Sequence, residues 1–181
     1  MTIELALPIG DVSHVYKQWQ DAPVGTILAF AGRCVVLRHG QVAGEVTESR
    51  LVVRAKSPLG PALASVSPDI GFMFGNSNVN SQMIENMVIA SGPALNISAQ
   101  VELALTNLTP SLVPHQKQSG SVIYDTADDA LLYVIDYPGY ADKGLVLKGQ
   151  DAWSVVDIPI QGGVLLGTLC IKPRRPPADS N

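Results

Sequence analysis

Three aspartates fall within one short polar stretch, where closely spaced carboxylates could hold a cation or act as a general acid and base. They are Asp125, Asp128 and Asp129, between the apolar runs Val122–Tyr124 and Leu131–Ile135. The stretch lacks the Asp-x-Asp-x-Asp-Gly spacing of a calcium loop. Aspartate also favours turns, because its side chain bonds to nearby backbone groups. The stretch therefore predicts a β-hairpin turn, with acid–base chemistry as the alternative.

The residue types that bind metals or act as nucleophiles are scattered along the sequence. The histidines, His14, His39 and His115, are far apart, and Cys34 and Cys170 form no Cys-x-x-Cys pair. Such spacing predicts no metal site, and we expect no cofactor. Each cysteine lies in an apolar run, where a thiol behaves as a small hydrophobic group. We expect two buried free thiols, and a disulfide between them stays open as the alternative.

Aromatic rings close to a carboxylate suggest a second kind of site. Tyr137, Tyr140 and Trp153 lie near predicted turns, and Asp136 precedes the first of them. Exposed rings beside such a carboxylate could stack on sugars. Tyrosine and tryptophan also bury their ring bodies and leave the polar end in water, which would make these residues structural.

Composition restricts the partners of the chain. Its 181 residues carry a net charge of −4, and only 15% of them are charged, below the ~25% of an average domain. This balance disfavours nucleic-acid binding, except through the basic C-terminal residues Lys172, Arg174 and Arg175. Low surface charge is typical of surfaces covered by neighbouring subunits, so we expect a homo-oligomer or a larger assembly. Phe72 and Phe74, with the three basic residues, are the candidate partner contacts.

The pattern of apolar residues predicts an all-β fold, an antiparallel sandwich or a jelly-roll or barrel with one or two short helices. Its clearest strand is Leu95–Thr106, where apolar and polar residues alternate, a pattern with no helical interpretation. The other expected strands include Thr2–Leu7, Thr26–Phe30, Cys34–Arg38, Glu45–Thr47, Leu51–Lys56 and Gly144–Lys148. The helical spacing of apolar residues predicts short helices over Val12–Gln20 and Ser81–Ala90.

One predicted hairpin organises the rest of the chain. The apolar runs Val155–Ile160 and Val164–Ile171 are joined through Gln161, Gly162 and Gly163. Paired glycines between β-branched runs favour a tight turn. Because both runs are apolar at nearly every position, we expect this hairpin to be covered on both faces.

A single β-rich domain is expected over residues 1–171, followed by a basic, proline-rich tail over 172–181. Ser57–Pro68, with three prolines, is the candidate for an internal loop boundary. No run is long and apolar enough to span a bilayer, and the start lacks the pattern of a signal peptide, so a virion or cytoplasmic location is expected.

Pro23–Gly32, PVGTILAFAG, resembles the opening of the tail-collar domain of bacteriophage tail fibres. After it the sequence continues Arg33-Cys34-Val35-Val36, without the second half of the family motif. The resemblance implies a trimeric virion protein involved in attachment.

We therefore favour a non-enzymatic structural or assembly protein, with a bacteriophage virion component as its most specific form. A carbohydrate-binding β-sandwich using Asp136, Tyr137, Tyr140 and Trp153 is the second hypothesis. The third is a small β-barrel enzyme with the aspartate turn or His115 as the acid–base group, although the sequence has no Gly-x-Ser-x-Gly elbow or phosphate loop.

Overall fold

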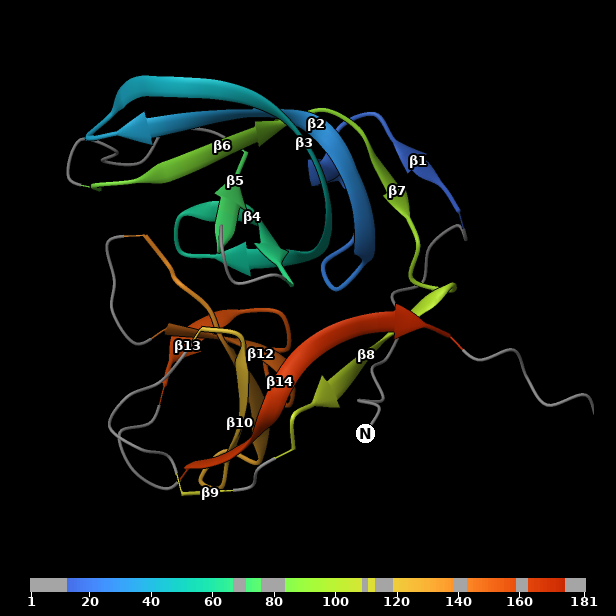
Figure 1. Cartoon of the computed structure of the whole chain (residues 1–181), viewed down its shortest axis with the longest axis vertical. Coiled ribbons are helices and arrows are strands. Elements are labelled where there is room, and N and C mark those ends of the chain that lie inside the picture. The colour runs from blue at the N-terminus through green and yellow to red at the C-terminus, as the bar shows by residue number, and fades with distance from the viewer. Residues whose placement is uncertain are drawn as a thin grey trace, which may run out of the picture.

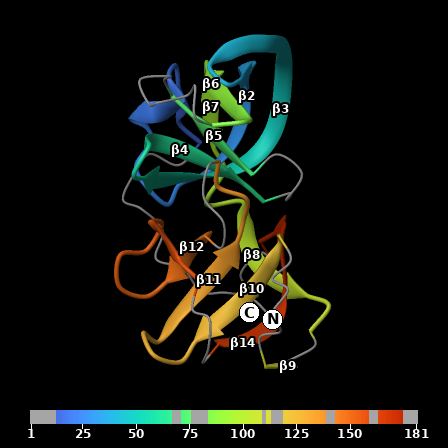
Figure 2. The ribbon, with the colours of Figure 1, turned by 90° about the vertical axis from the view of Figure 1, so that its left-hand side faces the viewer.

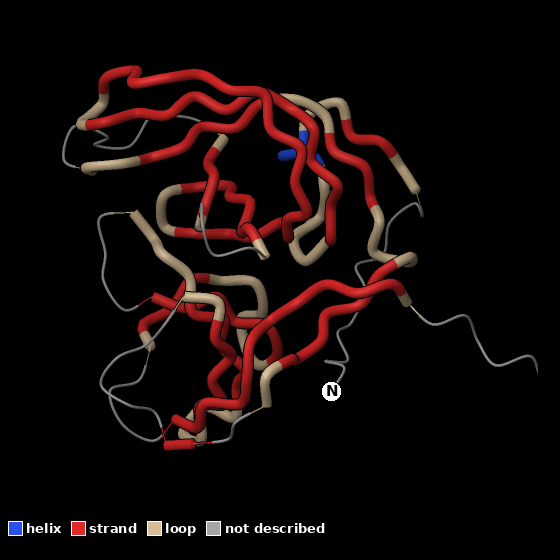
Figure 3. Tube along the Cα trace, viewed as in Figure 1, coloured by secondary structure: helices blue, strands red, loops and turns tan. Residues whose placement is uncertain are grey.

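The computed structural model confirms the predicted all-β class. It describes residues 13–66, 71–75, 84–108, 111–112, 119–138, 143–158 and 163–174. The described chain forms two seven-stranded sheets, and almost all of its regular structure is strand (Figures 1 and 3). Each sheet is made from a contiguous part of the sequence, β1 to β7 in the first and β8 to β14 in the second.

The first sheet contains β1 (Val15–Tyr16), β2 (Ile27–Arg38), β3 (Gln41–Ser57), β4 (Gly60–Ser65), β5 (Phe72–Phe74), β6 (Met87–Ser91) and β7 (Ala94–Asn96). The strand order is β1-β7-β2-β3-β4-β5-β6, and β2 also pairs with β6. This extra pairing closes the run from β2 to β6 into a small barrel. All pairings in the sheet are antiparallel except β5 with β6.

The second sheet contains β8 (Val101–Thr106), β9 (Ser111–Leu112), β10 (Ser121–Asp125), β11 (Ala130–Val134), β12 (Lys143–Lys148), β13 (Val155–Asp157) and β14 (Gly163–Pro173). Its order is β13-β12-β11-β10-β14-β8, with β9 paired to β14. Figure 2 shows it below the first sheet. The predicted hairpin around the aspartate turn is confirmed as β10 and β11.

Two buried clusters follow from the alternation of side chains along the strands. On β3, Val52 belongs to a cluster with Leu28 and Leu63 of the neighbouring barrel strands. The next residue, Val53, belongs to a larger cluster that also includes Leu145 of the second sheet. Around Val52 and Val53 the barrel strands are therefore buried on both faces, one within the barrel and the other against the second sheet.

The predicted strand Leu95–Thr106 is wrong as one element, because it supplies β7 to the first sheet and β8 to the second. The Ser98 backbone N–H donates to Asn96 Oδ1 at 3.0 Å, and the Ile27 N–H donates to Ser98 Oγ at 2.9 Å. Side chains that bond the backbone in this way compete with the sheet ladder, so the chain turns and crosses between sheets here.

The predicted Gly-Gly hairpin is also wrong. β13 pairs with β12, whereas β14 pairs with β8, β9 and β10, and the sheet order separates β13 from β14 by three strands. Most of β14 is half-buried rather than sealed. Gly149, Asp151 and Trp153 have positive φ and lie in the turn between β12 and β13. Because the chain reverses there, β13 pairs with β12 and not with β14.

Neither predicted helix forms as an α-helix in the described residues. Within Ser81–Ala90 the described part is a loop followed by β6, because Met87 and Ala90 are buried between strands rather than along a helical face. Within Val12–Gln20 the chain forms β1 and then the short 3-10 helix η1 (Trp19–Asp21). The expected strand Thr2–Leu7 lies outside the described residues.

Two expected loop boundaries move. Ser57–Pro68 contains β4, which pairs with β3 from Val52↔Ser65 to Ser57↔Gly60, so this segment is not a linker. β14 extends through Pro173, two residues into the predicted tail, and pairs there with β8. The described tail residues are therefore part of the second sheet or directly follow it.

Candidate functional site

The two aromatic rings of the predicted sugar site that the structure describes, Tyr137 and Trp153, are buried. Tyr137 is only 3% exposed, and its ring packs edge-on against Phe72 and Phe74 with centroids 5.3 and 5.9 Å away. Its hydroxyl accepts the Leu59 N–H at 3.1 Å. Asp136 is exposed, and its Oδ1 accepts a hydrogen bond from a neighbouring serine. The ring of Tyr137 therefore links the two sheets and offers no stacking face.

Trp153 is buried as well, with 8% of its surface exposed. A Cβ placed on Gly25 would lie 2.5 Å from the indole Nε1, so the absence of a side chain at Gly25 makes room for the ring. The backbone carbonyl of Trp153 accepts the Lys56 N–H at 3.0 Å, which ties β3 to the second sheet. Tyr140 lies outside the described residues. Tyr137 and Trp153, the two rings that the structure describes, pack in the core between the sheets.

The candidate partner contacts are likewise used within the chain. Phe72 and Phe74 are buried in the cluster between the sheets. Lys172 Nζ lies 3.5 Å from Glu102 Oε1 on the neighbouring strand, and Arg174 Nη2 donates to backbone carbonyls, the closest being 3.2 Å away. Arg175 lies outside the described residues.

The aspartate turn lies beside an acidic cleft of about 220 Å³. Its lining residues are Asp125, Asp128, Ala130, Leu132, Val146, Gln150, Asp151, Val156 and Asp157. Asp125 Oδ1 accepts the Ala127 N–H at 3.0 Å, and Asp157 pairs with Lys143 at 2.5 Å. Among the described residues, no three His, Cys, Asp or Glu side chains are placed to hold a metal ion. Two of the four carboxylates that line the cleft therefore have structural partners, Asp125 in its own turn and Asp157 in the ion pair with Lys143.

The other titratable candidates also have local structural contacts. Tyr124 donates its hydroxyl proton to Asp129 Oδ1 at 2.6 Å, and this bond, with the nearby carboxylates, raises the pKa of Tyr124. His14 packs edge-on against Tyr16 with ring centroids 4.6 Å apart. His39 occupies the positive-φ position of the turn between β2 and β3. His115 lies outside the described residues.

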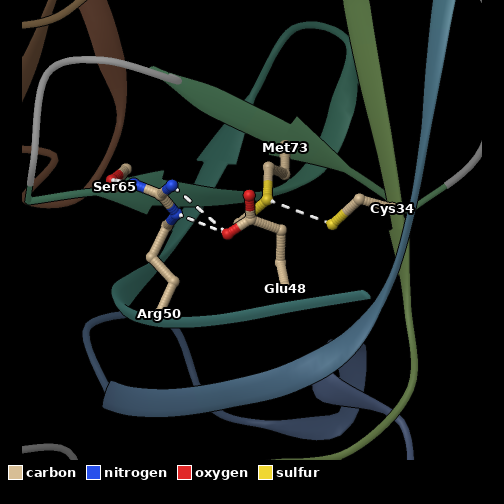
Figure 4. Close-up of polar contacts among 5 residues, drawn as sticks. All are labelled: Cys34, Glu48, Arg50, Ser65 and Met73. Atoms are coloured by element: carbon tan, nitrogen blue, oxygen red, sulfur yellow. Dashed lines mark hydrogen bonds and ion pairs between the residues drawn. The ribbon is translucent and has the colours of Figure 1, made fainter. Parts of the chain in front are cut away.

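The sequence patterns did not indicate a polar cluster that lies toward one end of the barrel (Figure 4). Arg50 Nε and Nη2 each lie 3.2 Å from Glu48 Oε2, and Arg50 Nη1 donates to Ser65 Oγ at 3.4 Å. The Cys34 thiol donates to Met73 Sδ at 3.7 Å. Both cysteines are free, as expected, but only Cys34 is fully buried, whereas Cys170 is half-buried. Every second residue of β3 faces the barrel, and this alternation could have predicted that Glu48 and Arg50 lie on the same face.

Burial is the main cause that raises the pKa of the Cys34 thiol, Glu48 adds to the rise, and Arg50 opposes it. A buried thiol with a raised pKa is a poor nucleophile, because the thiolate is the reactive form. Cys34 therefore belongs to the barrel core.

The raised pKa of Cys34 predicts a pH dependence of stability. The folded state favours the neutral thiol, so its contribution is complete below the unfolded pKa of about 8.5 and is lost as the pH rises through the folded pKa. We expect the free energy of unfolding of wild type to fall above that pH and the fall to be smaller for Cys34→Val. Urea unfolding at a series of pH values measures this, with Cys170→Ser as the matched control. An equal fall in Cys34→Val and wild type would contradict the assignment.

The opposite end of the barrel interior holds a second arginine, Arg54. Its guanidinium lies 5.5 Å from the centre of the Trp19 ring and donates to the carbonyls of Ala55 and Gln20. The Arg54 residue is 8% exposed, and burial lowers the pKa of its guanidinium. The Trp19 indole N–H donates to the Ala90 carbonyl at 2.9 Å. Stacking and carbonyl contacts thus hold this cation within the fold.

One surface remains after these groups are assigned, the first eleven residues of β3, Gln41–Leu51. None of them is buried, and the apolar side chains Val42, Val46 and Leu51 are 68%, 48% and 42% exposed. These are three of the five large hydrophobic side chains that are exposed among the described residues. Exposed apolar side chains concentrated on one strand are typical of an interaction surface. We call this segment the β3 edge.

The β3 edge has a strand neighbour on one side only within the described chain. It pairs with β2 throughout, whereas β4 pairs with β3 only from Val52 onward. β4 ends because the Ser65 N–H donates to the Gly71 carbonyl at 2.9 Å, and Tyr133 of β11 donates its hydroxyl proton to the carbonyls of Ser65 and Val66. These contacts attach the end of β4 to Gly71 and to β11.

Comparison of this chain with protein-family models, with curated proteins and with solved structures found no match. The segment Pro23–Gly32, which carries the tail-collar resemblance, leads into β2 and forms its first half. Among the described residues, no helix has the length and hydrophobicity required to cross a membrane.

Proposed function

We propose that this protein is a non-enzymatic structural protein that acts through contacts with copies of itself or with neighbouring subunits. The β3 edge carries the proposal, because it combines exposed apolar side chains with a single strand neighbour in the described fold. An exposed strand edge is a template for pairing with another chain, and proteins that remain monomeric usually shield it. A bacteriophage virion component is the specific form that the tail-collar resemblance of Pro23–Gly32 favours.

The use of the reactive side chains supports this choice over an enzyme. Asp125 and Asp129 bond within their own turn, and Cys34 is a buried thiol with a raised pKa. General acid–base catalysis requires such groups to converge on a space that a substrate can enter. Asp125 and Asp129 accept hydrogen bonds within their hairpin and Cys34 lies in the barrel core, which favours a role that depends on shape and surface.

Sedimentation equilibrium over a wide range of protein concentrations tests the proposal. The single chain has a mass of 19.2 kDa, and we expect a mass that rises with concentration to a multiple of this value. Concentration dependence is expected because association follows mass action. A mass of 19.2 kDa at every concentration would contradict self-assembly.

A further inference from the structure

On the side away from β2, the β3 edge has no strand neighbour among the described residues, and β4 defines where an added strand must stop. On the side of β3 away from β2, Val52 faces Ser65 of β4, whereas no described strand lies beside the positions before Val52. A strand that pairs with the β3 edge must therefore end or turn before it reaches Val52. A β-hairpin with its turn at that point meets this condition.

The chain itself contains such a hairpin, since β2 and β3 are joined through the turn residues His39 and Gly40. In an antiparallel pair of two β3 edges related by a two-fold axis, the residue on the axis determines which residues lie opposite one another. With Val46 on the axis, Gly40 of the second copy lies opposite Val52. This register lets the turn of each copy fit against the end of the other copy's β4. A register centred on any later residue would place β3 of the second copy over β4.

Avoidance of like charges disfavours the register one residue earlier. Centring the pair one residue earlier would set Glu45 opposite its own copy, and like charges directly opposite each other are destabilising. With Val46 on the axis, Glu45 lies opposite Thr47, and Glu48 lies opposite Gly44, which has no side chain. The Arg33 guanidinium also forms an ion pair with Glu45, which offsets the charge of that carboxylate.

The apolar contact at the axis provides a further favourable term. Val46 is 48% exposed in the single chain, and in this register it meets Val46 of the second copy. Apolar pairs directly opposite one another stabilise neighbouring strands. A register that pairs the exposed valines and separates the glutamates explains why an exposed apolar residue lies between the charged residues of this edge.

Resting on the proposed function, we propose that the occupant of the β3 edge is the β3 edge of a second copy. The two strands pair antiparallel about a two-fold axis at Val46, and the first sheets of both copies become one continuous sheet. The backbone supplies the hydrogen bonds, and the residue types from Gly44 to Glu48 determine the register.

Site-specific cross-linking tests the register. In a Cys34→Val, Cys170→Ser background, which removes the thiol that lies opposite position 46 on β2, Val46→Cys would place two thiols of different copies opposite each other, with Cβ atoms about 5 Å apart and within reach of a short bismaleimide. The matched control, Ser49→Cys, is on the same exposed segment, but its two copies would be separated by six residues of strand, roughly 20 Å. We expect a covalent dimer from Val46→Cys and little from Ser49→Cys.

A charge variant gives a second measurement. Val46→Lys would set two ammonium groups opposite each other at the axis, and we expect the dimer dissociation constant to rise about tenfold or more. Val15→Lys is the control, because Val15 is 57% exposed on β1 and is distant from the β3 edge in the strand order. Sedimentation of both variants measures the difference.

The outcomes separate the inference from the proposed function. If wild type self-associates but Ser49→Cys cross-links as well as Val46→Cys, or Val46→Lys associates like wild type, the β3 pairing is overturned and the structural function stands. A single-chain mass for wild type at every concentration would overturn the β3 pairing and self-assembly, and would leave contacts with neighbouring subunits as the remaining form of the proposed function.

Discussion

Replacement of Gly32 by alanine should destabilise the protein by about 3 kcal/mol or more, although it adds only one methyl group. Gly32 lies in the middle of β2, where β2 pairs with both β3 and β6. A Cβ there would overlap the Ser91 carbonyl oxygen and would lie 2.7 Å from the Phe30 ring. Because the carbonyl belongs to the last residue of β6, relief requires β2 and β6 to separate rather than a side chain to rotate.

Gly44 provides the matched control for this substitution. It is also a strand glycine, on β3 opposite Val36, but a Cβ at Gly44 would have no heavy atom within 4 Å. Gly44→Ala should therefore leave the free energy of unfolding unchanged or raise it by up to about 1 kcal/mol, since alanine reduces the freedom of the unfolded chain. Urea unfolding at low protein concentration compares the variants. Equal effects at Gly32 and Gly44 would contradict the close strand packing described for Gly32.

Replacement of Trp19 by alanine should have a comparable or larger effect, a loss of about 3–5 kcal/mol. Trp19 is 0% exposed and fills the barrel beneath the Arg54 guanidinium. Truncation would leave a cavity, would remove the indole N–H that donates to the Ala90 carbonyl and would leave the buried Arg54 cation without its aromatic neighbour. Those three losses occur together, which is why the expected effect is large.

Trp19→Phe separates the contributions, because it keeps an aromatic ring beside Arg54 and loses the hydrogen bond. We expect its loss of stability to lie between wild type and Trp19→Ala. The protein has two tryptophans, so Trp153 remains as the fluorescent reporter in both variants. Unfolding of Trp19→Ala at the same urea concentration as wild type would contradict the packing role of Trp19.

The sequence predicted the fold class because β-branched residues and a period of two are local properties. The hairpin around Asp125 was predicted for the same reason, since its strands are adjacent in sequence. Partners distant in sequence were not predictable from these patterns. The pattern predicts separate strands over Thr26–Phe30 and Cys34–Arg38 because Gly32 resembles a turn residue. In the structure Gly32 lies within a single β2 and permits the close approach of Ser91.

The candidate site depended on contacts that no local pattern contains. Among the described residues the β3 edge has one strand neighbour, since β4 ends at Ser65, whose carbonyl accepts a hydrogen bond from Tyr133, 68 residues further along the chain. Tyr137 and Trp153, two of the aromatic residues proposed for sugar binding, have suitable side chains, but both are buried by contacts with the first sheet or its connections. Tyr137 contacts Phe72, and Trp153 lies against Gly25, both of the first sheet or its connections.

The division of the chain at the Asn96–Ser98 turn has a consequence for synthesis. All strands of the barrel precede this turn. They therefore emerge from the ribosome, and can pair with one another, before the first strand of the second sheet emerges. Until the later half arrives, the apolar surface that includes Val53 and Phe72 has no cover from its own chain. During translation of about half the chain, this apolar surface of the nascent protein therefore stays exposed and able to bind other apolar surfaces.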